Sequence, residues 1–534
     1  MVDNILILGN GFDLAMGRNT SYENFLRFTD YIYLCVNFPL DGGYNEDNNE
    51  VIPNSISKET ISEIEKAIKL PFYEILTDND FEEVLETVSS LNISDLLSYY
   101  SYDILNLIEK NYRSCQQQIA IEVYPDYVGL FDGSWYNFII DKLDACVECL
   151  RTLNNGEKNK DYIPFDINTI VNLTVFQSGN DDSISIQSRN LSWLNRINDN
   201  LFIKYIKQNK ESLGNNWSNV ELTISDIAEA ILSLRSSLNE IDQLFSKNPT
   251  YPREDQAKMI KEKFINEQNY MAFSYIIDFL SLDFVVNPEK NRVNMIEELN
   301  EKFITELEQL TDYLEFYLTY LGEIDFSIRN IEKNKTILDE VSNIEKSKVI
   351  TFNYTNTANE LLNIPKENTH FIHGEIKFNR NADEINTMVF GIEDKENDID
   401  KINPELIPYQ KFYQRTVKET GNKFEEFFKP NFDFSADGDI SIVSKNIIVF
   451  GHSVDPLDKE IFQKCFELAN QEDEKVKYPY KFIFVYHDER AKRSIVKNLA
   501  IILGKQELIQ LTGKQKIVFV KSDDNSRMKK ELLE

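Results

Sequence analysis

The sequence of 534 residues predicts an α/β fold, in which a parallel sheet carries a large, mainly helical insertion after its first strand and helix. Three observations predict this. The chain opens with the apolar run Ile5-Leu6-Ile7-Leu8, helical periodicity dominates from about residue 60 to 340, and short apolar runs alternate with helical patterns after about residue 345. We therefore expect residues 1–30 and 345–534 to form one domain and residues 31–344 to form the insertion.

The opening run is typical of a strand that is covered on both faces. It leads into Gly9-Asn10-Gly11-Phe12-Asp13, where two glycines let the backbone pass close to a ligand or to another segment of the chain. A helix that begins near Phe12 would point its unpaired N–H groups at this turn, which is the usual place of a phosphate. The dinucleotide fingerprint needs a third small residue where this chain has Leu14, so an ordinary strand-to-helix turn is the alternative.

The middle of the chain has the periodicity of long amphipathic helices. Between Met295 and Tyr320, apolar residues recur three and four positions apart, which predicts one long helix with a buried face. Cys146 and Cys149 form a C-x-x-C on one face of a predicted helix, and no second pair follows at the spacing of a zinc site. We expect structural thiols there and no metal.

Six short apolar runs in the last third of the chain are typical of buried strands: Val349–Phe352, His370–Ile372, Met388–Phe390, Ile447–Phe450, Phe482–Tyr486 and Ile517–Val520. Helices fit between several of these runs, notably over Pro456–Asn470 and Asp488–Ile502. The opening strand has no partner nearby in the sequence, so we expect it to join this C-terminal sheet.

Charge and cysteine content limit the function classes. The chain has 57 basic and 89 acidic residues, which give a formal net charge of -32. The negative electric field of such a protein repels phosphate backbones, which counts against nucleic-acid binding. A small anionic cofactor can still bind through backbone amides. Five thinly spread cysteines indicate a reduced, cytoplasmic protein, and we find no signal peptide and no apolar run of bilayer length.

Candidate binding residues follow four of the predicted strands, at the edge where open α/β sheets bind ligands. They are Gly9, Asn10, Gly11, Phe12 and Asp13 after the first strand, Asn353 and Thr355 after the 349 strand, His373 after the 370 strand, and Gly451, His452, Ser453 and Asp455 after the 447 strand. Each has a plainer interpretation, since Asn can end a strand, a histidine can be an interior residue and Gly-His-Ser can be a tight loop. We expect His370 to pack against the sheet and His487 to lie at the surface.

Several of these motifs together resemble the AbiH-like bacteriophage abortive-infection family. The resemblance rests on Leu8–Ala15 with Thr20-Ser21-Tyr22, on Asn216–Glu221, on Thr351–Thr357, and on His373-Gly374-Glu375 with Gly451-His452-Ser453. One departure is Met16-Gly17-Arg18-Asn19, where the family more often has a histidine and a leucine beside the glycine. The residues Trp217–Glu221 suggest no chemistry by themselves.

A more distant resemblance is to the sirtuin-like (Rossmann-type) NAD-binding core, which has a glycine-rich first turn, an Asn, a His-Gly and a Gly-x-Ser turn in the same order. This resemblance implies that Asn353 orients ribose hydroxyls and an attacking water, and that His373 is the general base. It also implies that Asp13 contacts the ribose, or stabilises the positive charge that grows on it, and that the turns at Gly11 and Asp455 hold phosphates. The four-cysteine zinc module of sirtuin deacylases is absent from the sequence, which disfavours deacylation and leaves hydrolysis of NAD.

We therefore expect an effector of phage defence that binds NAD, as substrate, and hydrolyses its N-glycosidic bond. The alternatives are a non-catalytic nucleotide-binding sensor or assembly module, and an RNA nuclease, which the negative charge disfavours. Two questions stay open. One is the trigger that activates the protein, for which a phage product is a candidate, and the other is whether the chain assembles with a second copy of itself or with a partner subunit. We expect no membrane partner and no nucleic acid.

Overall fold

The computed structural model describes residues 2–29 except 27, residues 44, 45, 50 and 51, and the ranges 196–209, 217–247, 258–262 except 259, 269–279, 289–377, 386–392, 403–434, 440–470 and 477–533. The chain divides into two compact units, of which one is Met1–Tyr22 with Asn200–Glu534 and the other is Glu23–Asp199. Cys146 and Cys149 lie outside the described residues, as does most of the second unit. The domain boundaries expected at residues 30 and 344 therefore stay a prediction.

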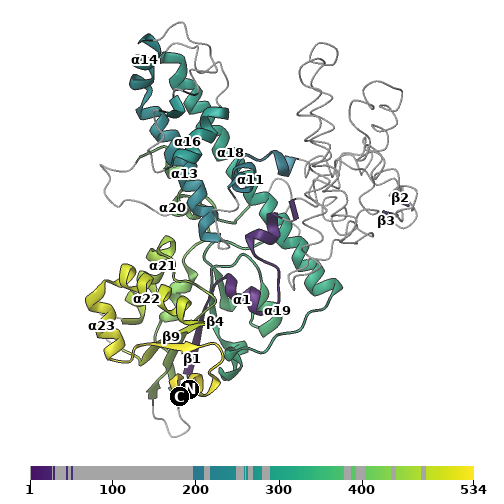
Figure 1. Cartoon of the computed structure of the whole chain (residues 1–534). Helices are drawn as coiled ribbons and strands as arrows, with labels where there is room; N and C mark the ends of the chain where they lie inside the picture. Colours follow the sequence, from purple (N-terminus) through teal and green to yellow (C-terminus); the bar gives the residue numbers. More distant parts are fainter. Residues whose placement is uncertain are drawn as a thin grey trace. The chain divides into compact units, whose positions relative to one another are not determined.

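The first unit contains a six-stranded sheet (Figure 1), and all of its strands are parallel. Its spatial order is β10-β9-β8-β1-β4-β5. The strands are β1 (Val2–Leu8), β4 (Lys348–Thr351), β5 (Thr369–Phe371), β8 (Ser444–Phe450), β9 (Tyr480–Tyr486) and β10 (Ile517–Lys521). The expected parallel sheet is confirmed, and so is the prediction that the opening strand pairs with strands more than three hundred residues away.

The central strand β1 is covered on both faces, as its unbroken apolar run predicts. Ile5 and Ile7 belong to one core cluster, whereas Leu6 and Leu8 belong to another, because successive side chains point to opposite faces of a sheet. All four side chains are at most 1% exposed. Burial of each stabilises the fold by roughly 1.5–3 kcal/mol.

Helices cover both faces of the sheet. The cluster of Ile5 and Ile7 contains residues of α21 (Lys459–Asn470), α22 (Glu489–Leu503) and α23 (Lys505–Gly513), the yellow-green and yellow helices of Figure 1. The cluster of Leu6 and Leu8 contains residues of α1 (Asn10–Ala15), α19 (Thr357–Leu362) and α24 (Asn525–Glu531). The helices expected over Pro456–Asn470 and Asp488–Ile502 are therefore present.

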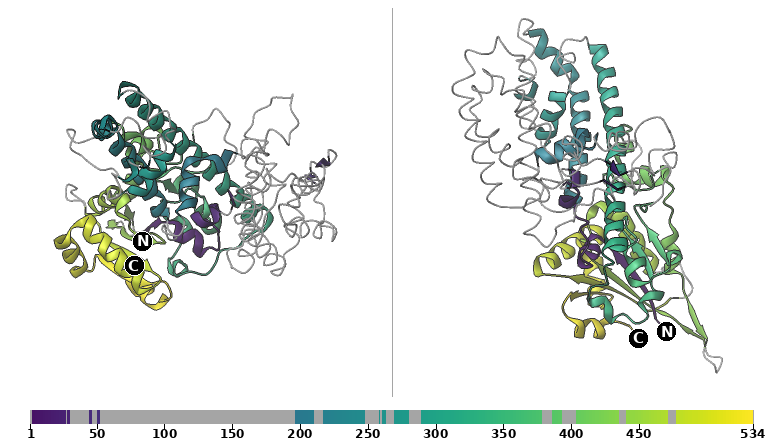
Figure 2. Two further views of the ribbon diagram at one scale, coloured as in Figure 1. Left: turned by 45° about the horizontal axis from the view of Figure 1, so that its top comes forward. Right: turned by 90° about the vertical axis from the view of Figure 1, so that its right-hand side faces the viewer.

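A group of helices between residues 201 and 328 belongs to the same unit as the sheet. It comprises α11 (Leu201–Gln208), α13 (Trp217–Ser236), α14 (Leu238–Lys247), α16 (Tyr270–Phe279) and α18 (Glu289–Gly322), which continues into the π-helix Glu323–Ile328. Figures 1 and 2 show α13, α16 and α18 side by side. The periodicity between Met295 and Tyr320 correctly predicted α18, whose face from Ile296 to Tyr317 is buried. No helix within the described ranges is long and apolar enough to span a membrane.

Short elements complete the described structure: β2 (Tyr44–Asn45), β3 (Glu50–Val51), α20 (Lys411–Val417), β6 (Phe432–Phe434), β7 (Ile440–Ile442) and the short helices Arg196–Asp199, Ile337–Glu340, Ile344–Lys346, Lys366–Asn368, Ile407–Tyr409, Lys423–Phe428 and Pro456–Asp458. One strand prediction was wrong. Met388–Phe390 is buried and forms no strand, because its amides bond outside a ladder. The N–H of Val389 donates to the carbonyl of His373, and that of Phe390 donates to the side chain of Gln414.

Candidate functional site at the carboxyl edge of the sheet

The polar segments expected at the strand ends follow four neighbouring strands of the sheet. Counted in chain order, the six strands lie in the order 3-2-1-4-5-6. β4 and β5 therefore lie on one side of the central strand β1, and β8, β9 and β10 lie on the other side. Open parallel sheets of this kind bind ligands beyond the carboxyl ends of their strands, where the direction reverses. At that edge the structure places the turns after β1, β4, β5 and β8.

The glycines after β1 and β8 bring two turns into backbone contact. Gly11 N–H donates to Gly451 O at 2.9 Å, and Gly9 N–H donates to Phe450 O at 3.1 Å. A Cβ on Gly9 would lie 2.7 Å from Gly451 O, and a Cβ on Gly451, whose φ is +71°, would lie 2.2 Å from the backbone N of Phe12. Close approach to another segment of the chain therefore accounts for these glycines, and a phosphate at this turn would have to use amides other than that of Gly11.

Asp13 and Asn353 form one polar cluster behind these turns. Asn353 Nδ2 donates to Gly9 O at 3.1 Å and to Asp13 Oδ1 at 3.0 Å, and Thr355 Oγ1 donates to Asp13 Oδ2. The carbonyl of Gly9 can only accept, so the atom that faces it is the amide nitrogen, and this fixes the orientation of the Asn353 amide. Asn353 Oδ1 accepts no hydrogen bond from the described residues, so this oxygen is the group that Asn353 can offer to a ligand.

A buried arginine supports the same cluster. Arg18 Nε donates to Asp325 Oδ2 at 2.9 Å, Nη1 donates to Thr357 Oγ1 at 2.6 Å, and Nη1 lies 4.0 Å from Asp13 Oδ2. Burial raises the pKa of Asp13, whereas Arg18 opposes this shift. Arg18 is part of the segment in which the sequence departs from the AbiH-like pattern, so the departure supplies a cation to this buried cluster.

His373 is the second predicted catalytic residue, and it lies after β5, the strand next to that of Asn353. Its Nε2 lies 3.1 Å from Asp458 Oδ1, and its buried Nδ1 has no hydrogen-bond partner in the described part of the chain. Burial and Lys411 lower its pKa from 6.5 to about 4. We therefore assign the neutral imidazole to His373, with the proton on Nε2 facing the Asp458 carboxylate and the lone pair on Nδ1. Gly374 is required beside it, because a Cβ there would lie 1.9 Å from Thr387 O.

His452 packs on the other side of Asp458. Its Nδ1 accepts the N–H of Val454 at 2.8 Å, so Nε2 carries the proton and lies 3.5 Å from Asp458 Oδ2. Val454 holds this N–H in place at a φ of +55°, a conformation that a β-branched residue rarely adopts. The imidazole also packs against Phe352, with ring centroids 4.2 Å apart and the ring planes tilted by 58°. His452 is therefore held in one tautomer.

Three charged side chains that the sequence did not assign complete this second cluster. Lys411 Nζ, on α20, lies 3.0 Å from both Asp458 Oδ1 and Glu221 Oε1, and Glu221 comes from α13. Burial raises the pKa of Glu221 to about 7, against the opposing effect of Lys411. Burial would also raise the pKa of Asp458, but Lys411 and His373 hold it well below its usual range. Membership of Trp217–Glu221 in the AbiH-like pattern was the one signal that could have pointed to Glu221.

Several of the other predicted site residues contact partners outside the two polar clusters. Asn10 Oδ1 accepts the hydroxyl of Thr20 at 2.6 Å, and Phe12 packs edge-on against Phe450 in the core. Ser453 is exposed, and Asp455 caps the short helix that it precedes by accepting Leu457 N–H at 3.1 Å. As expected, His370 is buried, stacked on Phe424, and His487 is exposed. The predicted roles of these residues in binding stay predictions.

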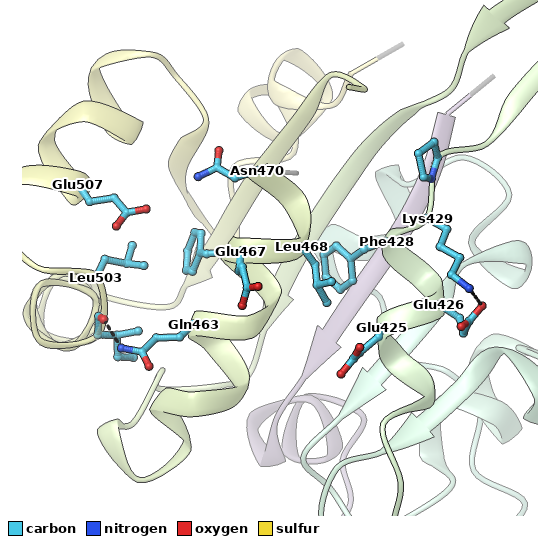
Figure 3. Close-up of a pocket in the computed structure, with 13 residues that line it drawn as sticks. Glu425, Glu426, Phe428, Lys429, Gln463, Glu467, Leu468, Asn470, Leu503 and Glu507 are labelled. Carbon is cyan, nitrogen blue, oxygen red and sulfur yellow. Dashed lines mark hydrogen bonds and ion pairs between the residues drawn. The ribbon is translucent and has the colours of Figure 1, made fainter. Parts of the chain in front are cut away.

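Figure 3 shows a cavity of about 810 Å³ away from these clusters, between Lys423–Phe428, α21, α22 and α23. Four glutamates line it, Glu425, Glu426, Glu467 and Glu507, against the single lysine Lys429. None of the predicted site residues is among its lining residues. Its negative charge does not suit a phosphate group, so we do not assign the nucleotide to it.

The fold and the site define an α/β protein with an open parallel sheet and two buried polar clusters at the carboxyl edge. Residues 181–480, more than half of the chain, match the family model described as Bacteriophage abortive infection AbiH, and the chain belongs to this family. No curated protein and no solved structure matches it. The matched range includes Glu221, His373, Lys411 and Asp458 and begins after Asp13.

Proposed function

We propose that this protein is an effector of phage defence that binds NAD at the carboxyl edge of its sheet and hydrolyses the N-glycosidic bond. The family supports the part of this proposal that concerns defence. The strand order 3-2-1-4-5-6 supports nucleotide binding, because it is the order of doubly wound, Rossmann-type sheets, which bind dinucleotides across this edge.

The observation that supports the chemical part is the position of Asn353 and His373 directly after two adjacent parallel strands. Asn353 offers an oriented carbonyl oxygen, and His373 offers a lone pair on Nδ1 in the neutral state. In the proposed reaction, Asn353 orients a ribose hydroxyl and the attacking water, and the one lone pair of His373 Nδ1 accepts a hydrogen bond from this water. Water oxygen bonds to the ribose C1′ and loses one proton, while the electrons of the C1′–N bond pass to nicotinamide.

Burial of both groups indicates how such an effector stays inactive. Asn353 is 7% exposed and His373 is 4% exposed, so a substrate reaches them only after the edge opens. An enzyme that consumes NAD in a healthy host needs this restraint. We propose that a signal of infection opens the edge.

The test is to measure NAD in cells that carry the protein, before and after phage infection, and free nicotinamide from the purified protein. We expect NAD to fall on infection, and Asn353→Ala and His373→Ala to abolish the fall. His370→Phe is the matched control, since His370 is also buried, stacks on Phe424 and lies outside both polar clusters. A wild-type protein that protects against phage without loss of NAD would exclude hydrolysis.

A sensor that binds a nucleotide without turnover is the second candidate. The same burial favours it, and so does the pKa of about 4 for His373, which makes this residue a weak base. Calorimetric binding of NAD by a protein that never releases nicotinamide would select this function over hydrolysis.

A further inference from the structure

Glu221 reaches the carboxyl edge from a part of the chain that is distant in sequence from every strand. It lies near the start of α13, and its side chain is 11% exposed. Its Oε1 lies 3.0 Å from Lys411 Nζ, while Oε2 has no hydrogen-bond partner among the residues that the structure describes. One carboxylate oxygen is thus held by the protein and the other can accept a proton.

A continuous chain of contacts connects this carboxylate to His373. Lys411 Nζ lies 3.0 Å from Asp458 Oδ1, and the same oxygen lies 3.1 Å from His373 Nε2. All four residues are buried, with Lys411 the least exposed at 2% and Glu221 the most exposed at 9% of its whole-residue surface. Because the interior screens charge poorly, a change of protonation at Glu221 acts on Lys411 and Asp458 and through them on His373.

We infer that Glu221 is a second acid–base residue of this site, the group that receives the proton of the attacking water. The inference rests on the proposed hydrolysis and adds the proton acceptor to it. As water bonds to C1′ and nicotinamide leaves with the electrons of the C1′–N bond, one proton of the water passes to Glu221 Oε2. The proton is then released to solvent, so the products are ADP-ribose, nicotinamide and one proton.

The charged and titratable groups around Glu221 suit this task. Lys411 on α20 favours its anion, while Asp458 and Asp455 disfavour it. Tyr354, after β4, faces the same carboxylate, and burial raises its pKa well above its usual value, so it stays neutral. The balance leaves the pKa of Glu221 at about 7, whereas that of His373 is about 4. Of the two, Glu221 is the stronger proton acceptor near neutral pH.

The test is the pH dependence of nicotinamide release by the triggered full-length protein and by its Glu221→Gln variant. We expect the wild-type kcat to rise as pH increases through about 7. Glu221→Gln should lower kcat by about 10²–10⁴-fold, which is the usual share of general acid–base catalysis, abolish this rise, and leave KM for NAD unchanged. Glu221→Asp keeps the carboxylate and should keep the pH-dependent rise at a lower kcat.

Asp226→Asn is the matched control, because Asp226 is an exposed carboxylate on the same helix. It should behave as the wild type. Circular dichroism and thermal unfolding establish that each variant is folded before its kinetics are compared. A folded Glu221→Gln variant that keeps both the wild-type kcat and the pH-dependent rise overturns the inference and leaves the proposed hydrolysis standing. A triggered wild-type protein that binds NAD and releases no nicotinamide overturns both.

Discussion

Replacement of Gly451 with alanine tests whether the glycines at the carboxyl edge serve the packing of the chain. A Cβ on Gly451 would lie 2.2 Å from the backbone N of Phe12 and 2.5 Å from the carbonyl carbon of Gly11. Both neighbours are backbone atoms, so no side chain can rotate away. The two turns would have to separate, and the hydrogen bond from Gly11 N–H to Gly451 O would lengthen or break.

Two contributions set the size of the effect. Gly451 has a φ of +71°, and an L side chain in this left-handed region costs about 1–2 kcal/mol. Overpacking against a fixed backbone costs roughly 1–3 kcal/mol more. We therefore expect the free energy of unfolding of Gly451→Ala to fall by about 2–5 kcal/mol.

Gly421→Ala separates the two contributions. Gly421 has a φ of +70°, and its added Cβ would meet no described atom within 4 Å. Only the conformational contribution applies, so we expect a loss of about 1–2 kcal/mol. Urea unfolding followed by circular dichroism measures both losses, and their difference isolates the contact between the turns. Equal losses in the two variants would refute the packing argument and return these glycines to a role in binding.

Three further results are expected. Arg18→Met should lower the free energy of unfolding in urea by about 3–5 kcal/mol, because the buried Asp13 would lose the cation beside it and Asp325 would keep only the partly exposed Arg329. A loss near zero would contradict this. The pKa of Glu221 is raised in the folded state, so its contribution to stability is full below the unfolded pKa of 4.5 and is lost as pH rises through about 7. The free energy of unfolding of the wild type, measured in urea, should therefore fall by at most about 3 kcal/mol across this window, and Glu221→Gln should remove this fall. The pKa of His373 is lowered in the folded state, so its contribution to stability is present above pH 6.5 and is lost as pH falls towards about 4. His373→Asn should weaken the fall in the free energy of unfolding on the acid side, and an unchanged dependence on pH would contradict the effect of burial.

Most of the sheet could be predicted because its strands are buried on both faces and leave unbroken apolar runs. Five of the six runs expected after residue 345 are strands, and β1 joins them. Met388–Phe390 has the same composition and is no strand, because hydrogen bonds to His373 and Gln414 replace the ladder. A short apolar run indicates burial, and its hydrogen-bond partners depend on the tertiary structure.

The candidate site was only partly predictable, for a different reason. Asn353 and His373 directly follow apolar strands, so their position at the edge could be inferred from the runs before them. Glu221 and Lys411 lie on helices and carry the residue types of an ordinary solvated helix face. Only the packing of α13 and α20 at the sheet edge buries them. No local pattern encodes that packing.

Stability alone does not account for the charges at this edge. Replacement of a buried ion pair or triad by apolar side chains is often neutral, or stabilising by about 1–4 kcal/mol, because burial removes the hydration of each ion. A chain that needed only to fix α13 against α20 could therefore use apolar contacts in place of Glu221 and Lys411. What the charges add is a carboxyl group with a pKa of about 7 connected to a histidine with a pKa of about 4. Environments that move the pKa values of neighbouring groups in opposite directions are how active sites divide acid and base roles, and the cluster at this edge has that property.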